Sequence, residues 1–266
     1  MFHVKHPPPR RPLKPSSLRP RPSVERCPEV RSPTHPRLVL PSRLFHVKHP
    51  VQQPTPYGPA QFAADVPVSR ETLDRLTAYA ELLQKWNRTI NLIGKGTEAD
   101  LWRRHMLDSA QLAPLFPSMD VTLVDMGSGA GFPGLVLAAM GVRETHLIEG
   151  DQRKCAFLRE AARLIGPGIT VHACRTDAAP EIMADVITAR ALAPVADLLT
   201  LGARFSSIHT IHVFPKGQNV DVELTESHKM WKMRLERIPS RTESAATILR
   251  LSEVRRVRDD HTDHTA

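Results

Sequence analysis

Cysteine, long apolar runs and an apolar leader are all missing or scarce in this chain of 266 residues. Its 3 cysteines, Cys27, Cys155 and Cys174, are odd in number and scattered, so neither a disulfide framework nor a metal site is predicted. The longest apolar stretch, 134–142, is far shorter than the roughly 20 residues that cross a bilayer. We therefore expect a cytoplasmic protein with no membrane partner and no bound metal.

Acidic residues are almost absent from residues 1–60, where Glu25 and Glu29 stand against 11 Lys and Arg. The formal net charge of +8 therefore comes from this segment, and the rest of the chain is close to neutral. The segment also holds 15 of the 24 prolines and few large apolar side chains, so it cannot bury enough surface to offset chain entropy. We predict disorder over 1–65 and a folded region from Val66.

One hexapeptide, FHVKHP, occurs twice in this segment, at 2–7 and 45–50. Its first four residues can be encoded by the palindrome TTTCACGTGAAA, and 68–72 can be encoded by the same palindrome in another frame. We hypothesise that the repeats record a protein-binding site in the DNA and that the start codon has been placed too far upstream. The codons at these three places test this hypothesis.

From Val66 onward the patterns predict helices first and then alternating strands and helices. Ser69 is a plausible N-cap of a helix that continues to Ile93, and a second helix is expected over 100–112 within a helical segment, 66–118. Strands are expected at 121–125, 145–149, 169–173, 186–189, 208–214 and 247–251, and helices from Pro133, over 154–164 and over 196–203.

The alternation predicts an α/β domain over 119–254, with a Rossmann-like, mainly parallel, doubly wound sheet. Residues 255–266 are predicted to be a polar tail.

A glycine-rich loop, VDMGSGAGFPG at 124–134, follows the first predicted strand. A triphosphate loop would end in Gly-Lys-Ser or Gly-Lys-Thr, and Phe-Pro-Gly stands there instead. The spacing of Gly127, Gly129 and Gly131 is also tighter than in a dinucleotide fingerprint. With the preceding Asp125, it resembles the first motif of S-adenosylmethionine-dependent methyltransferases, in which residues without Cβ let the backbone pass beside the ligand.

Glu149 ends the second predicted strand about 20 residues after the glycines, where an acid can accept hydrogen bonds from both ribose hydroxyls. This position does not separate NAD from S-adenosylmethionine, because both ligands contain a ribose. A surface carboxylate at a strand end is the alternative interpretation.

Five motifs occur in one order: WNRTINLI (86–93), RRHMLDSA (103–110), the glycine loop, RALAP (190–194) and FPKG (214–217). Together, over roughly 66–254, they resemble the RsmG (GidB) family of bacterial small-subunit rRNA guanine-N7 methyltransferases. The resemblance implies a class I S-adenosylmethionine-dependent methyltransferase fold with a small helical N-terminal extension. It also implies S-adenosyl-L-methionine as the cofactor and methylation of N7 of a guanosine in the decoding region (530 loop) of 16S rRNA.

The glycine loop, the second strand and the resemblance together indicate the residues that contact the cofactor. The expected contacts are Gly127, Gly129, Gly131, Phe132, Glu149, Thr176, Asp177 and Arg190. Two of them depart from the family pattern, since Phe132 stands where leucine is common and Asp177 where glutamate is usual.

The catalytic candidates are Arg190, Lys216 and Arg175, each at or just after the end of a predicted strand. Guanine N7 carries a free lone pair, so the reaction needs alignment of the reacting atoms more than a general base. Arg190 is expected to hold the cofactor carboxylate or a phosphate, and Lys216 to donate to guanine O6. Solvated surface charge is the alternative interpretation of each residue.

Arg104, His105 and Asp108 lie within one helical turn and are predicted to position the substrate above the pocket. The expected partner is 16S rRNA within a 30S subunit or an assembly intermediate, because a nearly neutral domain is poorly suited to holding naked RNA. The protein is expected to act as a monomer.

Two other functions fit parts of the sequence. A small-molecule methyltransferase of the same fold would leave the RRHMLDSA and FPKG matches unexplained. A nucleic-acid-binding regulator would use the basic segment 1–60 and keep the cofactor pocket only as a relic.

Deletion of residues 1–60 separates a methyltransferase from such a regulator. A methyltransferase retains its activity, because every matched motif lies downstream, whereas the regulator loses nucleic-acid binding. Methyl transfer and RNA binding are measured for the full chain and the truncated chain. Loss of methyl transfer in the truncated chain would contradict the predicted domain organisation.

Overall fold

The computed structural model describes residues 56–257, which belong to one compact unit, Gln52–Ala266. Most of the segment predicted to be disordered, both copies of the hexapeptide and most of the predicted polar tail lie outside the described residues. Among residues 56–257, no helix is long and apolar enough to cross a membrane.

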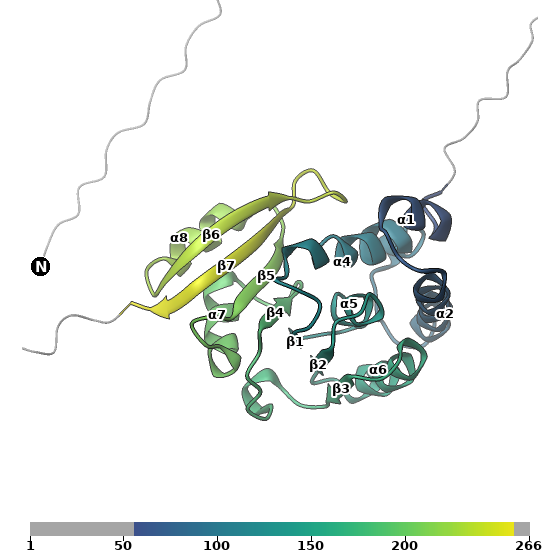
Figure 1. Ribbon diagram of the computed structural model, residues 1–266, viewed down its shortest axis with the longest axis horizontal. Coiled ribbons are helices and arrows are strands. Elements are labelled where there is room, and N and C mark those ends of the chain that lie inside the picture. Colours follow the sequence, from purple (N-terminus) through teal and green to yellow (C-terminus); the bar gives the residue numbers. More distant parts are fainter. Residues whose placement is uncertain (1–55, 258–266) are drawn as a thin grey trace, which may run out of the picture. The chain divides into compact units, whose positions relative to one another are not determined.

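Seven strands in the described residues form one sheet in the order β3-β2-β1-β4-β5-β7-β6 (Figure 1). The strands are β1 Thr122–Met126, β2 Glu144–Ile148, β3 Ile169–His172, β4 Val186–Ala189, β5 Ile211–Lys216, β6 Trp231–Pro239 and β7 Thr247–Arg256. Strands β1 to β5 pair in parallel, and β7 pairs antiparallel with both β5 and β6. The prediction of a mainly parallel, doubly wound sheet is confirmed.

Helices cover both faces of this sheet (Figure 1). The α-helices are α1 Pro59–Asp65, α2 Arg70–Asn87, α3 Lys95–Glu98, α4 Asp108–Ala110, α5 Gly134–Ala139, α6 Gln152–Ile165, α7 Val195–Gly202 and α8 Val220–Ser227. A π-helix, η1 Trp102–Leu107, and three short 3-10 turns, η2 Ala113–Leu115, η3 Thr176–Ala178 and η4 Ala203–Phe205, complete the described elements.

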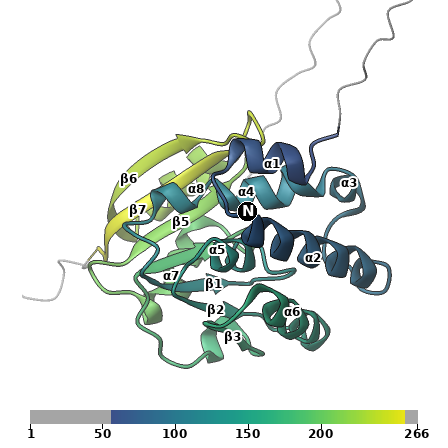
Figure 2. The ribbon, with the colours of Figure 1, turned by 45° about the vertical axis from the view of Figure 1, so that its right-hand side comes forward.

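The buried apolar side chains of the described residues form three clusters. Helices α2, α5 and α6 contribute to the first, α7 and α8 contribute to the second, and the third includes Leu137 of α5 and side chains of β1, β4, β5 and β7. Figure 2 shows α1 and α2 close together at one side of the domain, where they extend the layer that contains α5 and α6. The N-terminal helices are therefore part of the same folded unit as the sheet.

Helix α6 illustrates how the sequence produces one of these layers. The Asp151 carboxylate accepts hydrogen bonds from the first-turn amides of Arg153 and Lys154, which satisfies the N-terminus of the helix. Its buried side chains recur at helical spacing, and Gly166, with φ of 136°, ends the helix.

The predictions for the N-terminal region are partly confirmed. Ser69 caps α2, as expected, by accepting a hydrogen bond from the amide of Thr72. The predicted start of the folded region at Val66 is wrong, because helix α1 begins at Pro59 and buries Phe62. The helix expected over 100–112 is present mainly as the wider π-helical turn η1.

Two elements near the C-terminus were missed, α8 and β6. Strand β6 alternates exposed charged residues with partly buried apolar ones, such as Met233 and Leu235. This period of two is typical of a half-buried strand, and the prediction overlooked it. Strand β7 extends five residues beyond the predicted end at Leu251, because it pairs with β6 along this length.

Tyr79 joins helix α2 to the glycine loop that follows β1. Its side chain is fully buried, its hydroxyl donates a 2.5 Å hydrogen bond to the carbonyl of Ala130, and its ring lies 5.4 Å from the ring of Phe132. Burial raises the pKa of the Tyr79 hydroxyl well above its ordinary value, so this group remains a hydrogen-bond donor.

Tyr79→Phe removes this hydroxyl and leaves the buried carbonyl of Ala130 without its donor. We expect the free energy of unfolding to fall by about 1–3 kcal/mol, measured by urea denaturation. Tyr57→Phe is the matched control, since the Tyr57 hydroxyl bonds the exposed Asp65, and should change stability by no more than about 0.5 kcal/mol. Equal losses in the two variants would contradict a role of Tyr79 in holding the loop.

Candidate active site

A cleft of about 920 Å³ opens at the carboxyl ends of the parallel strands. Strand β1 lies between β2 and β4, so the chain order reverses here, and ligands of open α/β sheets bind outside such a switch point. The cleft is lined by parts of the segments 92–97, 104–108, 127–132, 148–154, 174–177, 190–192, 215–217 and 240–248, and by Leu201 and Glu223.

The glycine loop forms one wall of this cleft. Gly127 has φ of 65°, and a Cβ there would stand 2.7 Å from Cδ1 of Leu192, so a larger residue fits neither the backbone nor the space. Gly129 donates its amide to the carboxylate of Glu149 at 2.9 Å. The loop therefore presents backbone atoms, not side chains, to a ligand.

Asp125 supports the glycine loop from within the core. Its carboxylate accepts hydrogen bonds from the Thr188 hydroxyl at 2.8 Å and from the Gly134 amide at 3.3 Å. Burial raises the pKa of the Asp125 carboxyl to about 6, against the lowering effect of these hydrogen bonds. Asp125 does not line the cleft, so the acid of the glycine motif acts on the loop rather than on a ligand.

Glu149 stands at the end of β2 and lines the cleft. One carboxylate oxygen accepts the Gly129 amide, and the other accepts the Asp151 amide at 2.8 Å. Each oxygen can accept a second hydrogen bond, so the carboxylate is held in place and can still bind a hydroxyl group.

Arg175, Thr176 and Asp177 follow β3 and also line the cleft. Thr176 is buried, whereas the exposed guanidinium of Arg175 pairs with the carboxylate of Asp177 at 3.3 Å. Arg175 therefore lies at the edge of the cleft and is mostly hydrated, with 81% of its side chain exposed.

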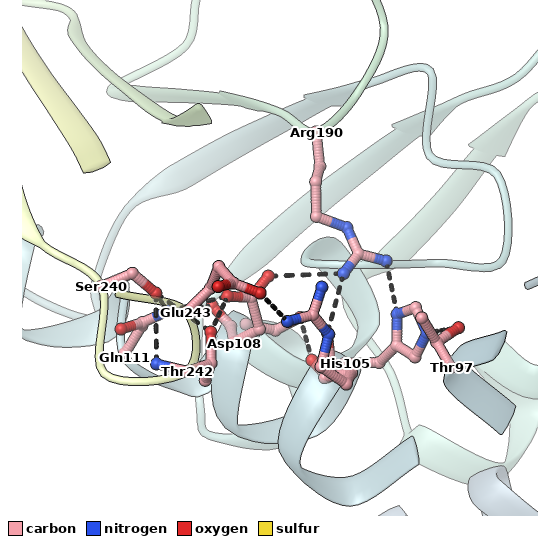
Figure 3. A network of polar contacts seen from close by, with 10 residues as sticks. Thr97, His105, Asp108, Gln111, Arg190, Ser240, Thr242 and Glu243 are labelled. Atoms are coloured by element: carbon pink, nitrogen blue, oxygen red, sulfur yellow. Dashed lines mark hydrogen bonds and ion pairs between the residues drawn. The ribbon is translucent and has the colours of Figure 1, made fainter. Parts of the chain in front are cut away.

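Arg190, just after β4, lies at the centre of a polar network that Figure 3 shows. Its guanidinium donates to Nδ1 of His105 at 2.9 Å and contacts the carboxylate of Asp108 at 3.4 Å. It also stacks over the ring of Phe132, with 5.1 Å to the ring centroid. The sequence placed these residues in three separate motifs, and the fold brings them together.

His105 is neutral in this arrangement. Burial, and then the positive charges of Arg190 and Arg104, lower the pKa of the His105 imidazole to about 3. Because Nδ1 accepts a hydrogen bond from Arg190, the proton resides on Nε2, which donates to the Thr97 hydroxyl at 2.9 Å.

Asp108 connects Arg190 to the segment between β6 and β7. One of its oxygens accepts hydrogen bonds from the Thr242 hydroxyl at 2.6 Å and from the Gln111 amide at 2.9 Å, as Figure 3 shows. The other oxygen contacts Arg190. The segment around Thr242 is thereby fastened beside the cleft.

Lys216, at the end of β5, is not a free cation. Its ammonium group pairs with the carboxylate of Glu223 at 2.6 Å and donates to the carbonyl of Ala193 at 2.9 Å. Glu223 also accepts the amide of Val195 at the start of α7. The pair therefore holds the segment that follows Arg190, and Lys216 has one N–H left for a ligand.

All the predicted site residues line this cleft except Gly131. The absence of a Cβ at Gly131 instead allows close packing of Leu135 and Leu158. Sequence reasoning missed Leu192, Glu223, Thr242 and Glu243. Leu192 lies inside the RALAP motif. The other three residues carry no local signal, because Thr242 and Glu243 contact residues more than 100 positions away and Glu223 contacts residues of other elements.

The strand order, the antiparallel β7 and a cleft bounded by a glycine loop at the switch point define a class I S-adenosylmethionine-dependent methyltransferase fold, as expected.

Comparisons with known proteins identify the family. The profile of GidB, described as rRNA small subunit methyltransferase G, matches residues 72–248. The chain is 54% identical over 198 residues to ribosomal RNA small subunit methyltransferase G of Rhodospirillum rubrum, covering 74% of this chain and 98% of that protein. It is 55% identical over 193 residues to the Rhodospirillum centenum protein of the same name, covering 73% and 89%. The chain belongs to the rRNA small subunit methyltransferase G family.

One solved structure to which the chain is similar, at much lower sequence identity, is the crystal structure of a fibrillarin/Nop5p complex, with 13% identity, a TM-score of 0.46 and coverage of 56% of this chain and 81% of that chain.

The lowered pKa of His105 can be measured directly. In ¹H–¹⁵N spectra of the histidine rings between about pH 5 and pH 8, we expect the His105 signals to keep the shifts of a neutral ring, unlike an unperturbed histidine with a pKa of about 6.5. A His105→Gln variant assigns the signals. Because the pKa is lowered on folding, the stability that neutral His105 contributes is complete above pH 6.5 and declines as the pH falls toward 3. Titration near pH 6.5 would contradict the buried arrangement.

Proposed function

We propose that this protein transfers the methyl group of S-adenosyl-L-methionine to N7 of a guanosine in the 530 loop of 16S rRNA. The observation that carries the proposal is the position of Arg190. Its guanidinium lies between the glycine loop and the RRHMLD motif, and both line one cleft at the switch point of the sheet. The names of the relatives, which are small-subunit rRNA methyltransferases, support the class of substrate.

The residues of the cleft fit this cofactor. The backbone at Gly127 is bare, so a nucleoside with an amino-acid tail can lie against it. The fixed carboxylate of Glu149 would accept the ribose hydroxyls, and Thr176 and Asp177 would contact the base. Arg190 would hold the carboxylate of the amino-acid portion or a phosphate of the substrate.

When bound, S-adenosyl-L-methionine supplies an electrophilic methyl group, and the protein has to align guanine N7 with it. Because its pKa is lowered to about 3, the His105 imidazole is a weak base, which agrees with chemistry in which no proton is removed before attack. Lys216, through its remaining N–H, would donate to guanine O6 and orient the base. Arg175 would act at the edge of the cleft, where it is exposed.

The substrate is proposed to be a folded rRNA within the 30S subunit or an assembly intermediate, bound by the protein as a monomer in the cytoplasm. The charge distribution supports this, since the basic excess of the chain lies in residues 1–60. A nearly neutral domain gains little nonspecific affinity from phosphates, so recognition of a folded surface is favoured over capture of naked RNA.

A gene deletion tests this function. We expect 16S rRNA from the deletion strain to lose one 7-methylguanosine, detected as the loss of one borohydride–aniline cleavage in the 530 loop. The gene for the wild-type protein restores the cleavage. Persistence of every cleavage signal in the deletion strain would overturn the assignment.

Arg190→Lys tests the residue on which the proposal rests. A lysine cannot reproduce the contacts of the guanidinium with His105, Asp108 and Phe132 at once, so we expect kcat/KM to fall by about 100-fold or more. The control is Arg163→Lys on α6, outside the cleft, which should leave kcat/KM unchanged within about twofold. If the Arg190→Lys enzyme is as active as this control, Arg190 has no role in the active site.

A further inference from the structure

Three arginines lie on two distant segments that meet beside the cleft, where Arg104 of one segment pairs with Glu243 of the other. Arg103 and Arg104 are neighbours in η1, and Arg241 lies between β6 and β7. Arg104 lines the cleft, as do Ser240 and Thr242, the residues on either side of Arg241. We refer to Arg103, Arg104 and Arg241 as the arginine rim.

Arg104 is occupied by a carboxylate from the opposite segment. Its guanidinium pairs with Glu243 at 2.5 Å, and both side chains remain partly exposed, at 37% and 45%. A guanidinium presents the same donors to a carboxylate and to a phosphate. An exposed pair of this kind stabilises a fold by about 0–1 kcal/mol only, so a phosphate can replace the carboxylate at little cost.

Arg103 and Arg241 are both exposed, and within residues 56–257 neither makes an ion pair of 4.0 Å or less. Burial and the hydrogen-bonded Asp65 raise the pKa of the Tyr57 hydroxyl to about 12, and the charges of Arg241 and Arg103 oppose this rise. The chain places both arginines next to the Arg104–Glu243 pair, since Arg103 precedes Arg104 and Arg241 is two residues from Glu243.

The rim is connected rigidly to the site. Gln111 accepts the backbone amide of Arg241 at 2.8 Å, and its side-chain amide donates to Asp108, the ion-pair partner of Arg190. A phosphate held at the rim would thus have a defined position relative to Arg190. Contacts to the backbone of a nucleic acid set its register in this way, whereas contacts to the base set specificity.

We propose that Arg103, Arg104 and Arg241 form a docking rim for the sugar-phosphate backbone of the RNA strand that carries the target guanosine, and that Glu243 occupies a phosphate position at Arg104 until RNA binds. The proposal rests on the proposed function in one respect, that the substrate is RNA. Beyond the proposed function, it names the surface that binds the RNA strand, and it names Glu243 as a carboxylate that competes with an RNA phosphate for Arg104.

Two variants of opposite expected effect test the rim. Glu243→Gln removes the competing charge and should tighten binding to the 30S subunit by about threefold to tenfold. The double variant Arg103→Glu/Arg241→Glu should weaken binding by about 10-fold to 100-fold and reduce the slope of log K against log salt by about 1–2. Binding of labelled protein to 30S subunits is measured by fluorescence anisotropy over a range of salt concentrations, with a synthetic RNA hairpin of the 530 loop as a second probe.

Matched controls separate the rim from general charge effects. Glu71→Gln breaks a 2.5 Å exposed pair with Arg75 that does not line the cleft, and Arg159→Glu/Arg163→Glu makes the same charge change on α6. For each control, the change in the logarithm of the dissociation constant should be less than half the change in the corresponding rim variant. Thermal unfolding confirms that all variants are folded.

The outcomes are distinct. If Glu243→Gln does not bind more tightly than Glu71→Gln, the competing role of Glu243 is wrong. If both double variants weaken binding equally, or neither does, the rim is wrong. A wild-type protein that binds the 30S subunit through the rim and yet methylates no guanosine would contradict the proposed function and leave the rim standing. An acidic protein that binds through the rim while RNA does not would overturn the choice of RNA.

Discussion

The arrangement of the site depends on one ion pair, that between Arg190 and Asp108. Their side chains are only 22% and 17% exposed, and charges so far removed from water need close partners. Asp108 is further satisfied by Gln111 and Thr242, and Arg190 by His105. One pair therefore holds together the end of β4, the helical segment before β1 and the connection between β6 and β7.

The requirement that buried charges be balanced also explains the states of two neighbouring side chains, His105 and Lys216. His105 can share a small space with Arg190 because its imidazole is neutral, which burial and the neighbouring arginines ensure. Lys216 instead keeps its charge, which the carboxylate of Glu223 in α8 balances. Both cations at the strand ends are thus held by carboxylates from helices, so their positions are defined before a ligand arrives.

Much of the domain was predictable, because its signals are local. The glycines after β1, the apolar strands and the Ser69 cap act within a few residues, and each is reproduced in the structure. Two failures have different causes. Strand β6 carries a local signal, the alternation of charged and apolar residues, which the prediction overlooked, whereas α1 is folded because Phe62 packs against Trp102, 40 positions along the chain.

The sequence by itself determined the class of sheet, the loop that approaches a ligand and the central polar residues of the cleft, since these follow from periodicity, from residues without Cβ and from ordered motifs. Only the tertiary structure decided which of these residues act on one another. It placed Asp125 beneath the loop, left Gly131 to packing and joined Lys216 to Glu223. The physical reason is that hydrogen bonds and ion pairs act over a few ångströms in space, and some of the residues that they join here lie up to 134 positions apart in the chain.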